Sequence, residues 1–139
     1  DTEADIGGTG KVIFTSDLDG GPQIFMSYLN GPTPTRVTKG LGNYNTTARF
    51  SNDASKITFI NRNSGVLQAY VLDLITQSAY PISSNAHHDI APSFAPNDKL
   101  ILFSSDNTVY ISNITGTTQT QLNNLNYTQI IDQRWARNN

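Results

Sequence analysis

Two adjacent histidines, His87 and His88, are the only ones in the chain, and Asp89 follows them. Imidazole and carboxylate groups are common ligands of zinc and of related metals. Neighbouring side chains in a strand-like segment point to opposite sides, so both imidazoles cannot readily reach one ion. We therefore interpret the segment as a solvated or partner-contacting loop, and we predict no metal site and no cofactor.

A second candidate for metal binding is Asp17-Leu18-Asp19-Gly20, which begins like a calcium loop. No third acidic ligand follows, and Tyr28 stands at the twelfth position, where such loops carry glutamate. The segment is better interpreted as a hairpin turn between two strands.

The residues of a nucleophilic enzyme are also missing from the sequence. The chain has no cysteine, which excludes disulfides, thiolate metal sites and a cysteine nucleophile. It contains no Gly-x-Ser-x-Gly segment of the kind that presents a catalytic serine. The sequence therefore predicts no catalytic residues and a protein that is not an enzyme.

Composition narrows the remaining classes of function. The chain has 139 residues, a length that favours one domain or a piece of a larger one. With 9 Lys and Arg against 11 Asp and Glu, the formal net charge is -2, so no basic face is expected for nucleic acid. No window of 18 consecutive apolar residues occurs, so the chain is not predicted to span a membrane.

An internal repeat organises the sequence. Three segments align as short strands with β-branched residues, and their phenylalanines Phe14, Phe59 and Phe103 lie 45 and then 44 residues apart. A second strand follows in each copy, and the third copy has a shorter intervening turn. The two strands of each copy are Lys11–Asp17 with Gln23–Met26, Lys56–Arg62 with Gln68–Val71, and Leu100–Asp106 with Thr108–Ile111.

Two further elements complete each copy. A short polar element suits the outer edge of a sheet: Thr35–Thr38, Ala79–Ile82 and Gln119–Leu122. A final element closes on one aromatic residue: Thr47–Phe50, Ala91–Phe94 and Asp132–Trp135. Four short strands every 40 to 45 residues, roughly, are typical of a propeller blade. The prediction is an all-β fold, a β-propeller of about three four-stranded blades.

The repeats are expected at about 11–55, 56–98 and 99–139, after a flexible lead-in over 1–10 with three glycines. We predict that the aromatic residues in repeat register form the core between blades rather than a ligand platform. These residues are Phe14, Phe25, Phe50, Phe59, Tyr70, Phe94, Phe103, Tyr110 and Trp135.

Four segments of the repeat resemble TolB-type β-propeller repeats: FTSDLDGGPQIF at 14–25, TRVT at 35–38, RFSND at 49–53 and PSFAPND at 92–98. The resemblance covers nearly all of residues 11–139. It implies that these residues form the C-terminal half, about the last three blades, of an originally six-bladed ring. It also implies a periplasmic location and membership of the Tol-Pal system.

The turn after the last element departs from the family's usual Ser-Pro-Asp-Gly. It reads Ser51–Ala54, Ala95–Asp98 and Ala136–Asn139, and we expect asparagine to occupy the left-handed position of the missing glycine. Three blades leave two open blade faces, so the sequence predicts self-association or pairing with the missing blades.

The loops around the mouth of the propeller channel are the candidate binding site. They are 39–46, 84–90 and 124–131, joined by 17–21 and 63–65, and their aromatic and amide side chains suit a protein-binding rim. The resemblance implies that the peptidoglycan-associated lipoprotein Pal docks there, and other Tol proteins and possibly colicins are further partners. The candidate rim residues are Asn43, Tyr44, Asn45, Thr46, His88, Asp89, Tyr127 and Gln129.

Two rival functions remain open at this point. The blades could be the gating propeller of a prolyl-oligopeptidase-like or tricorn-like peptidase, whose hydrolase domain would lie in another part of the polypeptide. They could also belong to a propeller lyase that uses His87 or His88 with a metal.

Overall fold

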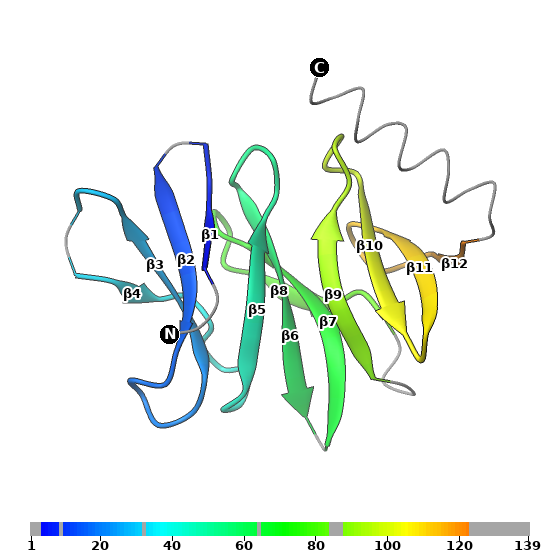
Figure 1. Ribbon diagram of the computed structural model, residues 1–139, viewed down its shortest axis with the longest axis horizontal. Coiled ribbons are helices and arrows are strands. Elements are labelled where there is room, and N and C mark those ends of the chain that lie inside the picture. The colour runs from blue at the N-terminus through cyan, green and yellow to red at the C-terminus, as the bar shows by residue number, and fades with distance from the viewer. Residues whose placement is uncertain (1–3, 9, 32, 64, 84–87, 123–139) are drawn as a thin grey trace.

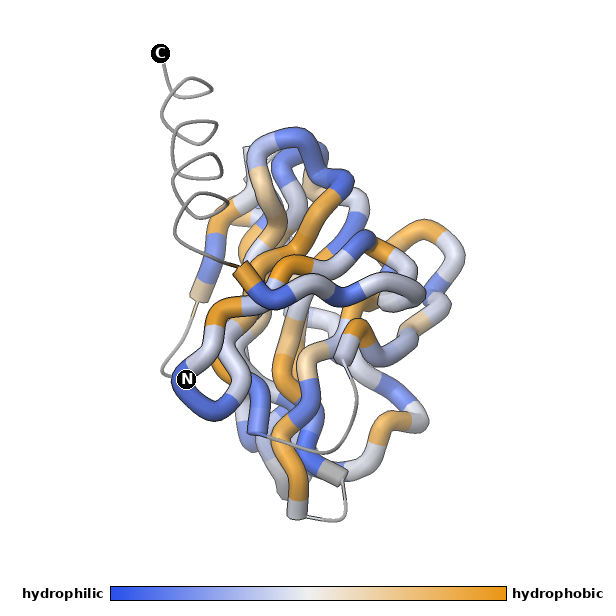
Figure 2. The backbone as a smooth tube through the Cα atoms, turned by 90° about the vertical axis from the view of Figure 1, so that its right-hand side faces the viewer, coloured by the Kyte–Doolittle hydropathy of each residue, from blue (hydrophilic) through white to orange (hydrophobic). Residues whose placement is uncertain are grey.

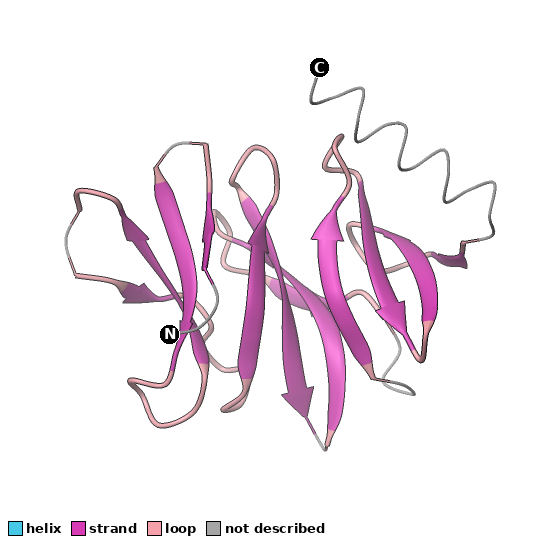
Figure 3. Cartoon of the chain, in the orientation of Figure 1, coloured by secondary structure: helices cyan, strands magenta, loops and turns pink. Residues whose placement is uncertain are grey.

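The computed structural model describes residues 4–8, 10–31, 33–63, 65–83 and 88–122. That part of the chain contains twelve strands, β1 to β12 (Figures 1 and 3). They form three four-stranded antiparallel sheets, each with its strands in sequence order. The prediction of an all-β fold with three four-stranded blades is confirmed. Blade 1 contains β1 (Ala4–Ile6), β2 (Lys11–Ser16), β3 (Gln23–Tyr28) and β4 (Thr35–Arg36). Blade 2 contains β5 (Asn45–Phe50), β6 (Lys56–Asn63), β7 (Val66–Asp73) and β8 (Ala79–Pro81). Blade 3 contains β9 (Asp89–Phe94), β10 (Leu100–Ser105), β11 (Thr108–Asn113) and β12 (Gln119–Gln121).

Within the described part of residues 1–10, strand β1 (Ala4–Ile6) corrects the prediction of a flexible lead-in. Ala4 pairs with Phe14 and Ile6 with Val12, and the Asp5 carboxylate accepts a hydrogen bond of 2.8 Å from the Phe50 backbone N–H. The glycines that indicated flexibility form the tight turn into β2 instead. Gly10 has a φ of +80°, a conformation that glycine adopts without steric cost.

The first strands of blades 2 and 3 belong to the sequence repeats before them. β5 and β9, the fourth elements of the first two repeats, pair with β6 and β10 of the following blades. The first two repeats therefore each span three strands of one blade and the first strand of the next. The predicted outer-edge elements are the fourth strands β4, β8 and β12, and the element Asp132–Trp135 lies outside the described residues.

Apolar side chains fill the two interfaces between blades. One cluster lies between blades 1 and 2 and the other between blades 2 and 3. Figure 2 shows hydrophobic residues, in orange, alternating with hydrophilic ones along the backbone. In each blade the two repeat aromatics contact each other, with ring centroids 5.6 to 6.0 Å apart. Phe25, Phe59, Phe94 and Phe103 are buried, and Phe14, Phe50, Tyr70 and Tyr110 are half-buried. Most of them belong to or pack against the two clusters between blades, as predicted, whereas Phe14 and Phe25 belong to neither cluster.

The tight turns correct the prediction of asparagine at the left-handed positions and confirm the prediction of a shorter turn in the third copy. The left-handed positions after the first strands of blades 2 and 3 are occupied by Ala54 (φ +60°) and Asp98 (φ +59°), not by asparagine. In blade 3, Asp106 and Asn107 both have positive φ and form a two-residue hairpin turn, which is the shorter turn expected for the third copy.

Candidate binding rim

Four of the connections between strands gather at one end of the molecule. In Figure 1 the connections β2–β3, β4–β5, β6–β7 and β10–β11 lie at the lower end, while the turns β1–β2, β5–β6 and β9–β10 lie at the upper end. The candidate residues in the described part of the chain, 43–46 and 88–89, lie in or directly after the connections at this lower end. We call residues 17–22, 40–46, 61–62, 65–67 and 88–89 the rim.

The rim is continuous across all three blades. A Cβ atom at Gly21 would lie 2.1 Å from the Asn43 carbonyl oxygen, so only glycine permits this approach of two loops. The Arg62 N–H donates a hydrogen bond of 3.0 Å to the Tyr44 carbonyl. The Leu67 N–H donates one of 3.2 Å to Nδ1 of His88. These contacts tie each loop to the next.

Buried amides hold the loop between blades 1 and 2 in place. Oε1 of Gln23 accepts hydrogen bonds from the Thr38 hydroxyl (2.7 Å) and from Nδ2 of Asn45 (2.9 Å). Nδ2 of Asn61 donates to Oδ1 of Asn45 (2.8 Å) and to the Leu41 carbonyl (2.7 Å). All four side chains are at most 3% exposed, so the network fixes the loop from beneath.

Asp89 has the corresponding role at the start of blade 3. Its side chain is 1% exposed, and Oδ2 accepts hydrogen bonds from the Ala69 N–H (3.0 Å) and from the Ser83 hydroxyl. Asn45 and Asp89 are each the first residue of an inner strand. Their burial corrects the prediction that they contact a partner, because a buried side chain positions the rim loops without presenting a surface.

The other candidate residues in the described part of the chain are accessible. Asn43 and His88 are exposed, and Tyr44 and Thr46 are half-buried. These four residues can meet a partner at the rim. Tyr127 and Gln129 lie outside the described residues.

Arg62 is a rim residue that the sequence analysis missed. Its guanidinium carbon lies 4.2 Å from the centroid of the Tyr44 ring, and the residue is exposed. Such stacking leaves the guanidinium edge free to bind a carboxylate. The repeat alignment contained a signal, because Arg62 stands where the other two copies have Asp17 and Asp106.

The described residues bear on two further possibilities, a metal site and a membrane-spanning helix. Within the described ranges, no three side chains of His, Cys, Asp or Glu gather as a metal site would require. Asp19 lies 3.4 Å from Nη1 of Arg36, and the Gly20 N–H closes a turn on the Asp17 carbonyl (3.0 Å). In the part of the chain that is described, no helix has the length and hydropathy needed to cross a bilayer. His87 lies outside that part.

Consecutive four-stranded antiparallel sheets, packed face to face, with the fourth strand of one sheet followed in sequence by the first strand of the next, define the chain as part of a β-propeller. The model of the TolB beta propeller domain family matches residues 1–138. The chain belongs to that family.

Solved structures agree with the family. The structure of putative TolB from Agrobacterium tumefaciens aligns with a TM-score of 0.79 at 16% identity, over 89% of this chain and 46% of that one. TolB from Acinetobacter baumannii aligns with a TM-score of 0.77 at 28% identity, over 88% of this chain and 32% of that one. An acylaminoacyl peptidase from Pyrococcus horikoshii aligns with a TM-score of 0.62 at 15% identity, over 88% of this chain and 25% of that one.

The chain spans about half the length of the Agrobacterium tumefaciens protein and about a third of the length of the Acinetobacter baumannii protein. No curated protein matches it.

Proposed function

We propose that the chain is part of a non-catalytic, periplasmic propeller of the Tol-Pal system and that it binds a peptidoglycan-associated lipoprotein at its rim. In this role it links layers of the cell envelope and supports outer-membrane integrity and constriction at division. The observation that carries the proposal is the continuous rim, in a chain whose family is TolB.

The chemistry of the rim supports a protein partner. Tyr44 and Arg62 form a stacked pair, and aromatic and arginine side chains are enriched among the residues that dominate binding energy at protein interfaces. Leu18, in the neighbouring loop, is 75% exposed and adds apolar surface. The buried amides beneath the loops limit the conformational entropy that the rim would lose on binding.

The rim is completed by further blades. Ile13 and Ile24 face blade 2, so the strand alternation turns Phe14 and Phe25 toward the opposite face of blade 1. On blade 3, Leu102, Val109 and Ile111 lie half-buried on the face opposite the core residues Ile101 and Phe103. These two free faces would pack against further blades, supplied by another polypeptide segment or by a second copy.

The test is binding to the periplasmic domain of Pal. The chain is titrated with this domain alone and after mixing with a polypeptide that carries the remaining propeller blades, while analytical ultracentrifugation reports whether the ring assembles. We expect binding that is strengthened in the assembled ring. Absence of binding by an assembled ring would reject the proposed function.

A second candidate function is the gating propeller of a peptidase. The observation in its favour is the structural similarity to the acylaminoacyl peptidase, which shows a shared fold. The genomic sequence that encodes the chain distinguishes the two functions. A hydrolase domain in the same reading frame would favour the peptidase, and a TolB-like N-terminal domain would favour the first proposal.

A further inference from the structure

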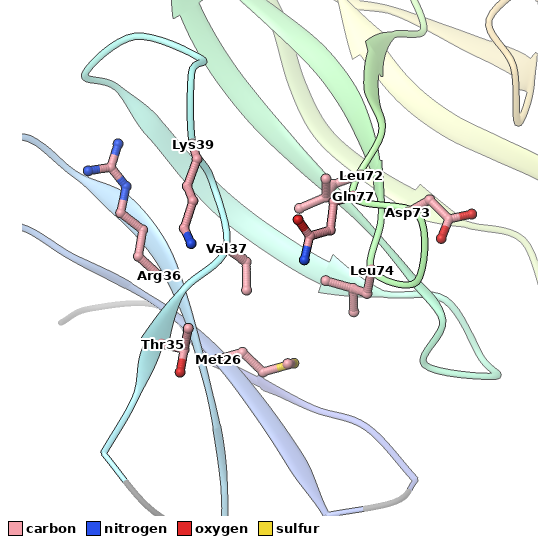
Figure 4. Close-up of a pocket in the computed structure, with 9 residues that line it drawn as sticks. All are labelled: Met26, Thr35, Arg36, Val37, Lys39, Leu72, Asp73, Leu74 and Gln77. Atoms are coloured by element: carbon pink, nitrogen blue, oxygen red, sulfur yellow. The ribbon is translucent and has the colours of Figure 1, made fainter.

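A cavity of about 160 Å³ lies on the seam between blades 1 and 2, and it includes no rim residue. One wall comes from β3, β4 and the segment after β4, and the other comes from the end of β7 and the turn that follows (Figure 4).

The floor of the cavity is apolar. Met26 and Val37 of blade 1 face Leu72 and Leu74 of blade 2, and all four side chains pack against or belong to the core cluster between the blades. A cavity of about 150 Å³ with apolar walls is large enough to bind benzene. The space on this seam therefore fits one aromatic ring or one branched alkyl group.

Both carboxylates near the cavity already have a cationic partner. Oδ2 of Asp19 lies 3.4 Å from Nη1 of Arg36, and Oδ2 of Asp73 lies 3.8 Å from Nζ of Lys56. Figure 4 shows the Arg36 guanidinium and the Asp73 carboxylate pointing away from the gap between the two walls. These charges contribute little to the selection of a ligand.

Thr35, Lys39 and Gln77 are the polar lining residues that remain, and Lys39 carries the charge among them. In the described part of the chain no carboxylate lies within ion-pair distance of the Lys39 ammonium, which extends toward Val37 in Figure 4. The Gln77 amide points from the other wall toward blade 1. Its backbone is fixed by a hydrogen bond of 2.8 Å from its N–H to the Asp73 carbonyl. One cation and one amide above an apolar floor favour a ligand with a single negative charge.

We propose that this cavity binds an apolar carboxylate. The aryl or branched alkyl group of the ligand fills the space above Met26, Leu72 and Leu74, and its carboxylate accepts hydrogen bonds from Lys39 and Gln77. A polypeptide that ends in phenylalanine carries this chemistry, and so does a free aromatic acid. No lining residue of the cavity belongs to the rim as defined above, although Lys39 adjoins the rim and begins the candidate loop 39–46. The test below uses small ligands without Pal, so its outcome is distinguishable from that of the docking test.

The test is an NMR titration that follows the methyl groups of Val37, Leu72 and Leu74. The probes are 3-phenylpropanoate, the peptide acetyl-Ser-Gly-Phe with a free carboxylate, and the amide of each. We expect saturable shifts with at least one acid and binding of its amide that is about 5-fold weaker or more. The tighter of the two acids identifies the source of the ligand as a polypeptide C-terminus or a small acid.

Two variants make the test specific. Lys39→Gln removes the unpaired cation from an exposed loop position and is expected to weaken binding of the acid about 5-fold. Lys99→Gln removes an exposed lysine from the β9–β10 turn and is expected to leave binding unchanged. The proposal is overturned if neither acid gives saturable shifts at these methyl groups, if acid and amide bind equally, or if Lys39→Gln binds like the unsubstituted chain.

Discussion

Arg62 and Tyr44 join blade 2 to the loop that enters it through two contacts. The Arg62 N–H donates a hydrogen bond of 3.0 Å to the Tyr44 carbonyl, and the Arg62 guanidinium carbon lies 4.2 Å from the Tyr44 ring centroid. The backbone contact brings the two side chains together, and the stacking orients the guanidinium at an exposed position of the rim. The pair is therefore preorganised for contact with a partner.

The first prediction concerns this pair. Arg62→Ala should weaken binding of the Pal periplasmic domain to the assembled ring about 10-fold. The substitution removes the cation–π contact with Tyr44 and the guanidinium that would bind a carboxylate of the partner. Arg62→Lys should recover only part of the affinity, since lysine lacks the planar fork. Isothermal titration calorimetry measures both.

The control for Arg62→Ala is Lys99→Ala, a cation lost from the β9–β10 turn at the other end of blade 3. It should bind Pal like the unsubstituted chain. If Arg62→Ala and Lys99→Ala bind Pal with equal affinity, Arg62 does not belong to the contact surface. That result would not reject the proposed docking of Pal.

The second prediction separates two neighbouring asparagines. Asn45→Ala leaves hydrogen-bonding atoms of Gln23 and Asn61 without their buried partner and should lower the free energy of unfolding by about 1–3 kcal/mol. Asn43→Ala, at an exposed position, should change it by less than about 0.5 kcal/mol. Urea unfolding followed by circular dichroism gives both values, and similar effects of the two substitutions would contradict the assigned amide network.

The third prediction compares two residues in the left-handed conformation. The Asp98 carboxylate accepts hydrogen bonds from the Asn52 N–H (2.7 Å), the Asn52 side chain (2.7 Å) and the Asp53 N–H (3.0 Å), and so links the turns of blades 2 and 3. Asp98→Gly relieves backbone strain but removes these bonds, so it should destabilise the chain by about 1 kcal/mol. Ala54→Gly relieves the same strain and loses only a buried methyl group, so it should be nearly neutral.

Thermal or urea unfolding of the two glycine variants measures this difference. A stabilising Asp98→Gly would mean that backbone strain outweighs the link between the turns.

The fourth prediction concerns acid. Hydrogen bonds from the Ser55 N–H, the Ser55 hydroxyl and the Ser51 hydroxyl lower the pKa of Asp53 from 3.8 to about 2. A carboxyl group with a lowered pKa in the folded state contributes stability above its unfolded pKa and loses it as the pH falls through the folded pKa. Unfolding midpoints in urea should therefore fall between about pH 4 and pH 2.

Asp53→Asn should make that fall shallower, because asparagine does not titrate. The pKa of Asp73 is also lowered, first by the Thr76 N–H, so Asp73→Asn should act in the same direction. An identical pH dependence in Asp53→Asn and in the unsubstituted chain would contradict the role given to Asp53.

The sequence alone predicted the blades because strand signals are local. Alternating apolar residues and turn residues recur with each copy, and an antiparallel strand pairs with its nearest neighbour in sequence. Phe14, Phe59 and Phe103 could therefore be placed in equivalent strands from their spacing. Strand β1 was missed because it is only three residues long and is followed by glycines, a composition that a mobile segment shares with a tight turn.

The tertiary structure decided which rim residues are accessible. Asn43 and Asn45 are alike in sequence, but only Asn45 meets Gln23 and Asn61, which come from strands of two different blades. Arg62 reaches Tyr44 because β5 and β6 pair, and the seam cavity exists because side chains of two blades meet incompletely there. Burial and contact between blades depend on residues far apart in the chain, and local sequence periodicity carries no information about them.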